Sequence, residues 1–272
     1  MLTTTLKARI AEHPQWYHTL ELGEGVVTPG WFDLRNVVDA VGMPASLAGK
    51  RCLDVATFDG FWAFEMERRG ADGVVGIDLL DPHLWDWPVV GTDEAREAIS
   101  ARKGAGEGFL MAREALGSAV ERLELSVYDL DPAVVGTFDF VYVGSLLLHL
   151  RDPIRAIEKV RSVCTGQALF VDVIDPILTA LTRRPIATFD GRHRPWWWTP
   201  NLAGFRRMVE AGGFEVTSTP RRVLLPAGGG QDRPRIDLAT VRTLRTQHGR
   251  MNLVRARIGD PHGAMLARPL DK

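Results

Sequence analysis

Short apolar runs alternate with helical stretches through the middle of the chain. Runs typical of buried strands cover residues 51–56, 73–78, 123–128, 138–143 and 168–173. Helical patterns lie between them, in residues 61–69, 93–102, 109–120 and 152–164. Strands that alternate with helices predict βαβ units, and the lack of polar alternation within the runs fits strands buried on both faces. The pattern therefore predicts an α/β fold with a doubly wound, mostly parallel sheet.

The two ends of the chain extend this pattern. A further helix is expected over residues 201–211, and further strands over 214–219, 223–225 and 263–267. The first 45 residues precede the first βαβ unit and hold Trp16, Tyr17, Trp31 and Phe32. We therefore expect an N-terminal cap or lid of residues 1–45. The sheet domain would then cover residues 46–272, with an insertion around residues 174–200 that covers the substrate.

Composition limits the class of protein. The 272 residues are 45% hydrophobic and 25% charged, with a formal net charge of -1, which excludes a disordered chain. The apolar runs are much shorter than a membrane span, and the first residues lack the apolar core of a secretory signal. Cys52 and Cys164 are too few for a disulfide framework, so a reducing compartment is expected. We expect a soluble, cytoplasmic globular protein.

The small net charge conceals an asymmetry along the chain. Residues 1–182 hold 27 acidic and 16 basic side chains, whereas residues 183–272 hold 7 acidic and 17 basic ones. Such a division indicates an anionic partner, two surfaces of one molecule that face each other, or an ordinary solvated basic face. Arginines close to aromatic residues would suit a nucleic acid substrate. The arginines in question are Arg183, Arg184, Arg192, Arg194, Arg206, Arg207, Arg221 and Arg222.

Three acidic residues lie at the ends of the first three predicted strands. Asp54 comes late in the first strand, Asp78 ends the second strand and Asp129 follows the third. Ligands of doubly wound sheets bind beyond the carboxyl ends of the strands, where a carboxylate can accept the hydroxyls of a ribose. A single acid of this kind is more often a helix cap, but three together favour a nucleoside site. The first loop lacks G-x-G-x-x-G, which argues against a dehydrogenase.

These motifs resemble those of class I S-adenosylmethionine-dependent methyltransferases, from about residue 50 to residue 219. The matching residues are Leu53-Asp-Val with Gly60, Val75-Gly-Ile-Asp78, Tyr128-Asp129, Phe138 to His149, and Ala211-Gly-Gly-Phe214. Within that superfamily the chain is most similar to the tRNA wobble-uridine carboxymethyltransferase group. That likeness extends to Trp16–Leu22, Thr28–Trp31 and Pro200–Phe205. The resemblance implies a Rossmann-like methyltransferase sheet that binds S-adenosylmethionine.

The resemblance also implies roles for individual residues. Asp54 and Gly60, with the loop residues Ala56, Thr57 and Phe58, would lie near the methionine end of the cofactor. The remaining cofactor residues would be Asp78 and Leu79 at the ribose, Asp129 with Tyr128 or Leu130 at the adenine, and Gly144 or Ser145 below the sulfonium. Carboxymethyl transferases hold an extra carboxylate with a lysine and a tyrosine, which match His18 and Leu148 here. Leucine cannot hold a carboxylate, so ordinary S-adenosylmethionine is expected.

Three histidines and three tryptophans are candidates for the acceptor side of the site. Methyl transfer needs a general base only when the acceptor starts protonated, and His149, His18 and His193 are the candidates. The alternative for His149 is a structural residue bonded to the backbone. Trp31, Trp197 and Trp198 are expected to contact substrate, because three consecutive tryptophans at 196–198 cannot all face a core. Some of these rings could equally pack the insertion against the sheet.

We therefore expect methyl transfer to an O or N atom of a small, aromatic or apolar metabolite. The alternative is a tRNA wobble-uridine modifying methyltransferase or carboxymethyltransferase, which the basic carboxyl-terminal third favours. A degenerate fold that serves as a scaffold is a third option, supported by the altered loop but opposed by the three acids. No group of His, Cys, Asp and Glu has the spacing of a metal site. The sequence does not determine the oligomeric state.

Overall fold

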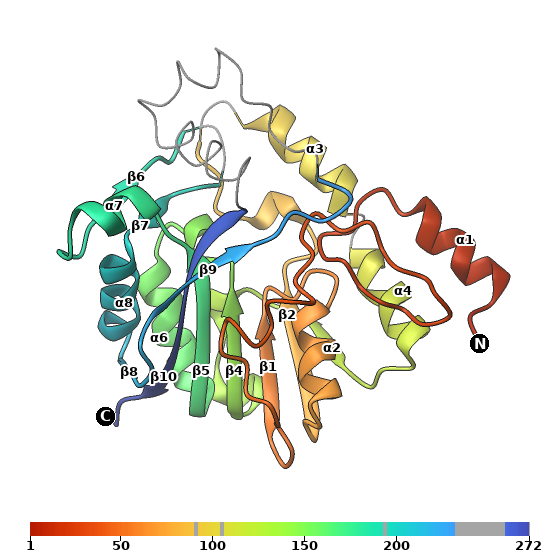
Figure 1. Ribbon diagram of the computed structural model, residues 1–272, viewed down its shortest axis with the longest axis horizontal. Helices are drawn as coiled ribbons and strands as arrows, with labels where there is room; N and C mark the ends of the chain where they lie inside the picture. The colour runs from red at the N-terminus through yellow and green to blue at the C-terminus, as the bar shows by residue number, and fades with distance from the viewer. Residues whose placement is uncertain (90–91, 104–105, 193–194, 232–258, 272) are drawn as a thin grey trace.

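The computed structural model describes residues 1–89, 92–103, 106–192, 195–231 and 259–271. Within these ranges the central sheet has eight strands in the order β3-β2-β1-β4-β5-β10-β8, and β9 pairs with β10 (Figure 1). Five strands are mutually parallel: β1 (Arg51–Val55), β2 (Gly73–Asp78), β3 (Glu121–Glu124), β4 (Phe138–Gly144) and β5 (Cys164–Val173). The order reverses between β1 and β4, which is where doubly wound sheets bind ligands.

The last part of the sheet is antiparallel. β10 (Asp260–Pro269) runs against β5 and pairs on its other edge with both β8 (Phe214–Val216) and β9 (Arg221–Leu225). This strand is longer than the expected 263–267, and its first residues lie at the same edge of the sheet as the ends of the parallel strands. A small separate ribbon, β6 (Ala187–Phe189) and β7 (Trp198–Pro200), forms within the predicted insertion.

Helices cover both faces of the sheet (Figure 1). One face carries α2 (Phe61–Arg68) and α4 (Glu107–Leu116), and α1 (Thr4–Glu12) packs against α4. The other face carries α5 (Pro132–Val135), α6 (Pro153–Val163) and α8 (Leu202–Ala211). In Figure 1, α3 (Asp93–Lys103) lies above the carboxyl ends of the parallel strands, and α7 (Pro176–Leu181) lies near the small ribbon.

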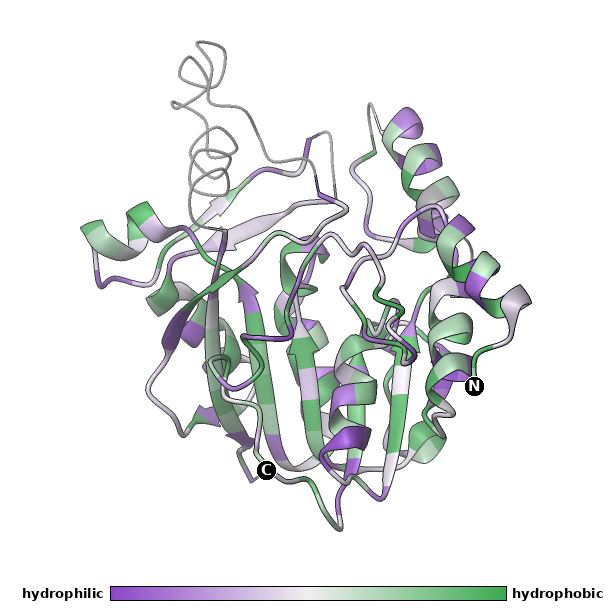
Figure 2. Ribbon diagram, turned by 45° about the vertical axis from the view of Figure 1, so that its right-hand side comes forward, coloured by the Kyte–Doolittle hydropathy of each residue, from purple (hydrophilic) through white to green (hydrophobic). Residues whose placement is uncertain are grey.

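Alternate strand residues fill two hydrophobic cores, one on each face of the sheet. Cys52, Phe140 and Leu169 belong to the first core, whereas their chain neighbours Leu53, Val141 and Phe170 belong to the second. Figure 2 shows the central strands as mainly hydrophobic and the covering helices as striped with polar residues. Each strand is therefore buried on both sides, which explains why the strands lack polar alternation. The predicted fold class is confirmed.

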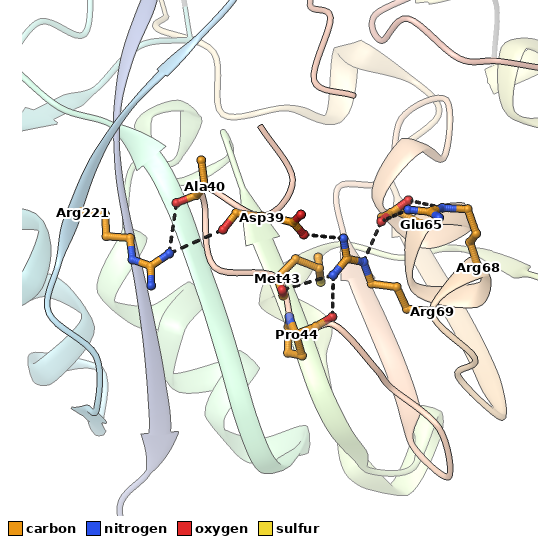
Figure 3. A network of polar contacts seen from close by, with 8 residues as sticks. All are labelled: Asp39, Ala40, Met43, Pro44, Glu65, Arg68, Arg69 and Arg221. Atoms are coloured by element: carbon orange, nitrogen blue, oxygen red, sulfur yellow. Dashed lines mark hydrogen bonds and ion pairs between the residues drawn. The ribbon is translucent and has the colours of Figure 1, made fainter. Parts of the chain in front are cut away.

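The N-terminal segment, residues 13–47, shares the first of these cores. It has little regular structure, yet Trp16, Leu22 and Leu47 are almost fully buried there against α2 and α4. Its end is held by Arg69, which bonds Glu65 and Asp39 and donates to the backbone oxygen of Pro44 at 2.6–2.8 Å (Figure 3). The segment therefore packs closely on the sheet, and its role as a cap or lid stays a prediction.

Two of the predicted boundaries that were wrong have an identifiable local cause. The third strand ends at Glu124 instead of continuing to Tyr128, because Ser126 accepts from the Tyr128 N–H and begins a 3-10 turn over Val127–Asp129. The helix expected to reach residue 120 ends at Leu116, where Gly117 takes the left-handed conformation that terminates helices. No helix among the described residues is long and apolar enough to cross a membrane.

Candidate active site

A cavity of about 550 Å³ opens at the carboxyl edge of the sheet. The last residues of four parallel strands line it, namely Val55, Asp78, Gly144 and Val173. Residues of α3, the N-terminal segment and the start of β10 complete its wall. Its size and mainly apolar lining are those of a small-molecule site. The predicted strand-end location of the site therefore coincides with a real cavity.

The loop between β1 and α2 forms the floor of the cavity through backbone conformations that are rare for side-chain-bearing residues. Ala56 and Phe58 both have positive φ, at 64° and 50°, and both line the cavity. Gly60 has φ 91°, and a Cβ atom there would lie 2.4 Å from the Phe64 ring. Asp54, Thr57 and Gly60 are buried behind this surface and are not lining residues. Of the predicted loop residues, Ala56 and Phe58 are thus the ones that line the cavity.

Asp54 acts as a buried anchor for this loop. Its carboxyl accepts a hydrogen bond from the Ala63 N–H at 3.1 Å, near the start of α2. Complete burial raises the pKa of Asp54 to about 7, although the Thr57 hydroxyl and His18 act in the opposite direction. The side chain therefore holds strand and helix together without reaching the cavity.

Asp78 forms a buried ion pair that the sequence did not indicate. Lys103, the last residue of α3, places Nζ 2.8 Å from both carboxylate oxygens. It donates a hydrogen bond to Oδ1 and another to the backbone oxygen of Leu79, and its ammonium lies 4.9 Å from the rings of Phe58 and Trp85. The second carboxylate oxygen, Oδ2, accepts no hydrogen bond, although it is buried. A buried acceptor beside a cavity is a site for a hydroxyl donor.

Only some of the residues predicted to contact an adenine line the cavity. Leu79 and Tyr128 line the cavity, and the Tyr128 hydroxyl donates to Asp86 at 2.7 Å. Asp129 lies in the 3-10 turn after β3 and is exposed, whereas Leu130 is buried in the second core. Neither is a lining residue, so their roles at an adenine stay predictions.

The end of β4 is tightly built. Gly144 and Ser145 line the cavity, and a Cβ atom on Gly144 would lie 2.2 Å from the Tyr142 hydroxyl. Ser145 has φ 49°, and its Oγ lies 2.9 Å from Nε2 of His262 on β10. Sequence reasoning missed His262, because it lies just outside the apolar run that predicted the last strand.

Buried Asp172 on β5 holds the turn after β4. It accepts from the N–H groups of Leu146 and Leu147 at 2.9 and 2.6 Å. Burial raises the pKa of Asp172 to about 6, and these hydrogen bonds act in the opposite direction. The carboxyl therefore fixes the backbone that follows Gly144 and Ser145.

The three predicted histidines have different surroundings. His149 lines the cavity, and its Nδ1 lies 2.7 Å from the backbone oxygen of Pro195. His18 also lines the cavity and pairs with the buried carboxylate of Asp59. His193 lies outside the described residues. The structure therefore brings His18 and His149 to one cavity and pairs His18 with a carboxylate.

Some of the tryptophans line the cavity, and others donate hydrogen bonds to backbone oxygens without lining it. Trp31 and Trp196 line the cavity. Trp197 and Trp198 are not lining residues: their indole N–H groups donate to the backbone oxygens of Asp86 and Arg151. Trp62, Trp85 and Trp87 also line the cavity, and sequence reasoning missed all three. The substrate roles of Trp197 and Trp198 stay predictions.

Among the described residues, no group of three or more His, Cys, Asp or Glu side chains could hold a metal ion.

Comparison with known proteins supports the fold. No protein-family model and no curated protein matches the chain. Two structures of the N-terminal domain of EvdMO1, one with S-adenosylhomocysteine (SAH) and D-fucose and one with SAH, match 100% of this chain and 98% of theirs, with 14% identity and a TM-score of 0.54. A chain of the complex between the Haloferax volcanii Trm112 methyltransferase activator and a candidate methyltransferase matches with 13% identity. Its TM-score is 0.50, over 88% of this chain and 90% of that one.

At these identities the likeness concerns the fold, which is that of class I methyltransferases. The closer likeness to the tRNA wobble-uridine group stays a prediction.

Proposed function

We propose that this protein is an S-adenosylmethionine-dependent methyltransferase whose acceptor is a small, aromatic or apolar metabolite. The observation that carries the proposal is Asp78 at the end of β2, which lines the cavity and whose buried Oδ2 is ion-paired with Lys103 but accepts no hydrogen bond. A ribose hydroxyl is such a donor, and a carboxylate after the second strand is the usual ribose partner in doubly wound sheets. Lys103 Nζ lies 2.8 Å from this oxygen too, but its hydrogen bond goes to Oδ1, so Oδ2 can still accept from a ribose hydroxyl.

The residues around Asp78 fit the rest of the cofactor. Leu79 and Tyr128 offer apolar contacts for an adenine, and Ala56 and Phe58 also line the cavity. Bound S-adenosylmethionine would supply an activated methyl group. The protein would align the acceptor in line with that group and exclude water from the site. The match to a fold whose EvdMO1 example was crystallised with SAH supports the same cofactor.

Aromatic walls support a small acceptor. Trp31, Trp62 and Tyr142 line the cavity, and the rings of Trp62 and Tyr142 stack with centroids 4.3 Å apart. Such walls suit a flat or apolar molecule, and the volume suits a small one. A tRNA acceptor stays a prediction of the sequence, since much of the basic carboxyl-terminal third, residues 232–258, lies outside the described ranges.

Calorimetric titration with SAH tests the cofactor site. Asp78→Asn keeps the shape of the side chain and an oxygen for Lys103 but removes the charge. Loss of a charged hydrogen bond costs about 1.5–3 kcal/mol, so SAH binding should weaken at least about tenfold. The matched control is Asp93→Asn, because the Asp93 side chain is 91% exposed at the start of α3. Undiminished binding by a folded Asp78→Asn protein would overturn the proposal.

A further inference from the structure

His18 and Asp59 form a buried pair in the cavity wall. His18 Nδ1 lies 2.5 Å from Asp59 Oδ1, and the two side chains are only 7% and 2% exposed. Asp59 Oδ2 accepts from the backbone N–H groups of Tyr17 and His18 at 2.9 and 2.7 Å. Asp59 belongs to the loop between β1 and α2, and His18 belongs to the N-terminal segment. The imidazole is therefore fixed through both its ring and its backbone.

The partner of Nδ1 determines which ring nitrogen can accept a proton. A carboxylate only accepts hydrogen bonds, so the proton of the neutral imidazole sits on Nδ1 and Nε2 keeps a lone pair. His18 lines the cavity, and Asp59 does not engage its Nε2. A buried carboxylate on Nδ1 and an available Nε2 form the arrangement by which serine hydrolases orient a general base.

Aromatic neighbours hold the plane of this imidazole. Phe61 stacks on it with ring centroids 5.3 Å apart and an interplanar angle of 30°. Tyr17 meets it edge to face, with centroids 4.8 Å apart. Rings packed on two sides leave the imidazole little freedom to turn. The orientation toward the cavity is thus built into the site before any ligand arrives.

We propose that His18 is the general base of this protein and that the acceptor atom is a hydroxyl oxygen on an aromatic or apolar molecule. The inference rests on the proposed methyltransferase function and narrows its acceptor from O or N to O. An aromatic amine already offers a lone pair at neutral pH, and a carboxylate is already ionised. A hydroxyl group is the acceptor that gains from a base.

The methyl transfer moves one proton to His18 and one electron pair to sulfur. The hydroxyl proton passes to His18 Nε2, and an oxygen lone pair forms the new bond to the methyl carbon. The bond from that carbon to the sulfonium sulfur breaks, its electron pair stays on sulfur, and a neutral thioether remains. His18 is then an imidazolium whose charge the Asp59 carboxylate balances. Asp59 is therefore a positioning residue, and the proton leaves His18 for solvent once the product departs.

Matched acceptors separate base catalysis from every other role of His18. The probes are para-phenylphenol and para-phenylaniline, which share a ring system and differ in the acceptor atom. We expect wild-type protein to release SAH from S-adenosylmethionine with the phenol. His18→Gln should lower kcat for the phenol by about 10²–10⁴-fold, the usual contribution of a general base. SAH affinity, measured by calorimetry, should change by less than about twofold, because the base acts on the acceptor.

The imidazole can also be observed without turnover. In protein labelled with ¹⁵N-histidine, long-range NMR spectra should show the His18 signals with a protonated Nδ1 and a bare Nε2, assigned by their loss in His18→Gln. Asp59→Asn should lower phenol turnover and disturb these signals, because an amide N–H can face Nδ1 and move the proton to Nε2. His83→Gln is the matched control, because His83 is exposed and lies outside the cavity.

Each outcome decides between the two proposals. If SAH does not bind the wild type, the proposed function fails. If SAH binds but the phenol is not methylated, or if His18→Gln methylates it as fast as wild type, the base and hydroxyl proposal is overturned while the cofactor site stands. A proton on Nε2 in the wild type would overturn it as well.

Discussion

From the ion pair between Lys103 and Asp78 we predict that removing Lys103 lowers the free energy of unfolding. Both side chains are almost completely buried, at 1% and 7% exposed, with Nζ 2.8 Å from the carboxylate. Burial lowers the pKa of Lys103, and the Asp78 carboxylate opposes that shift. Replacing Lys103 by methionine fills similar space but leaves Asp78 buried without a counter-charge. Breaking a buried pair from one side costs about 3–5 kcal/mol.

Two further contacts would be lost in the same variant. The ammonium lies 4.9 Å from the rings of Phe58 and Trp85, and cation–π contacts contribute about 0.5–2 kcal/mol each. Methionine restores some packing against these rings, so the ion pair dominates. A loss of about 3–5 kcal/mol is a large part of the usual 5–15 kcal/mol of a folded protein. Lys103→Met should therefore unfold at clearly lower urea concentration.

A double-mutant cycle isolates the pair from general effects of substitution. Urea unfolding at neutral pH would be measured for wild type, Lys103→Met, Asp78→Asn and the double variant. We expect the double variant to lose less stability than the two single losses added together, by about 2 kcal/mol or more. The reason is that the double variant contains no unpaired charge. The reasoning fails if Lys103→Met stays within about 0.5 kcal/mol of wild type, or if the two single losses simply add.

Two further predictions concern the loop between β1 and α2. The pKa of Asp54 in the folded protein, about 7, lies above its ordinary value of 3.8. The contribution of Asp54 to the free energy of unfolding is therefore full below about pH 4 and is lost as the pH rises through about 7. This pH-dependent loss amounts to about 4 kcal/mol, and it should be absent in Asp54→Asn. Urea unfolding at about pH 5 and about pH 8, between which about 3 kcal/mol of that loss falls, checks this, and equal pH slopes for variant and wild type would contradict it. Gly60→Ala should lower the free energy of unfolding by about 2–4 kcal/mol, because it adds overpacking against Phe64 to a strained φ. Thermal unfolding measures that loss, with Gly49→Ala as the control for positive φ in open space.

The strands were predictable because burial on both faces leaves a continuous apolar signal. Phe138–Gly144 and Cys164–Val173 contain the expected runs, and the helix at Pro153–Val163 begins where Asp152 accepts from the Arg155 N–H. The third strand was misplaced because Glu121–Glu124 is polar and largely exposed at the sheet edge. An edge strand of this kind carries little hydrophobic pattern, so local turn chemistry at Ser126 decided its end.

The sequence predicted only those site residues that the topology of the sheet brings together. Asp78 and Gly144 end parallel strands, and parallel strands bring their ends to one edge. Lys103 ends a helix of mostly charged and polar residues, and nothing in the segment DEAREAISARK separates it from a surface lysine. The pairing of Lys103 with Asp78 depends on the packing of α3 over the cavity, which the sequence does not indicate. The same holds for His262, which an antiparallel strand returns to Ser145.

The pairing of His18 with Asp59 links the chemistry to the folding of the N-terminal segment. Asp59 accepts from two backbone N–H groups of that segment and from the imidazole, so one carboxylate both anchors the segment and orients the base. It also directly precedes Gly60, whose positive φ shapes the loop that forms the cavity floor. A change that loosens this loop should therefore displace the base along with the floor. Cofactor binding and acceptor activation would then respond together to substitutions in residues 56–60.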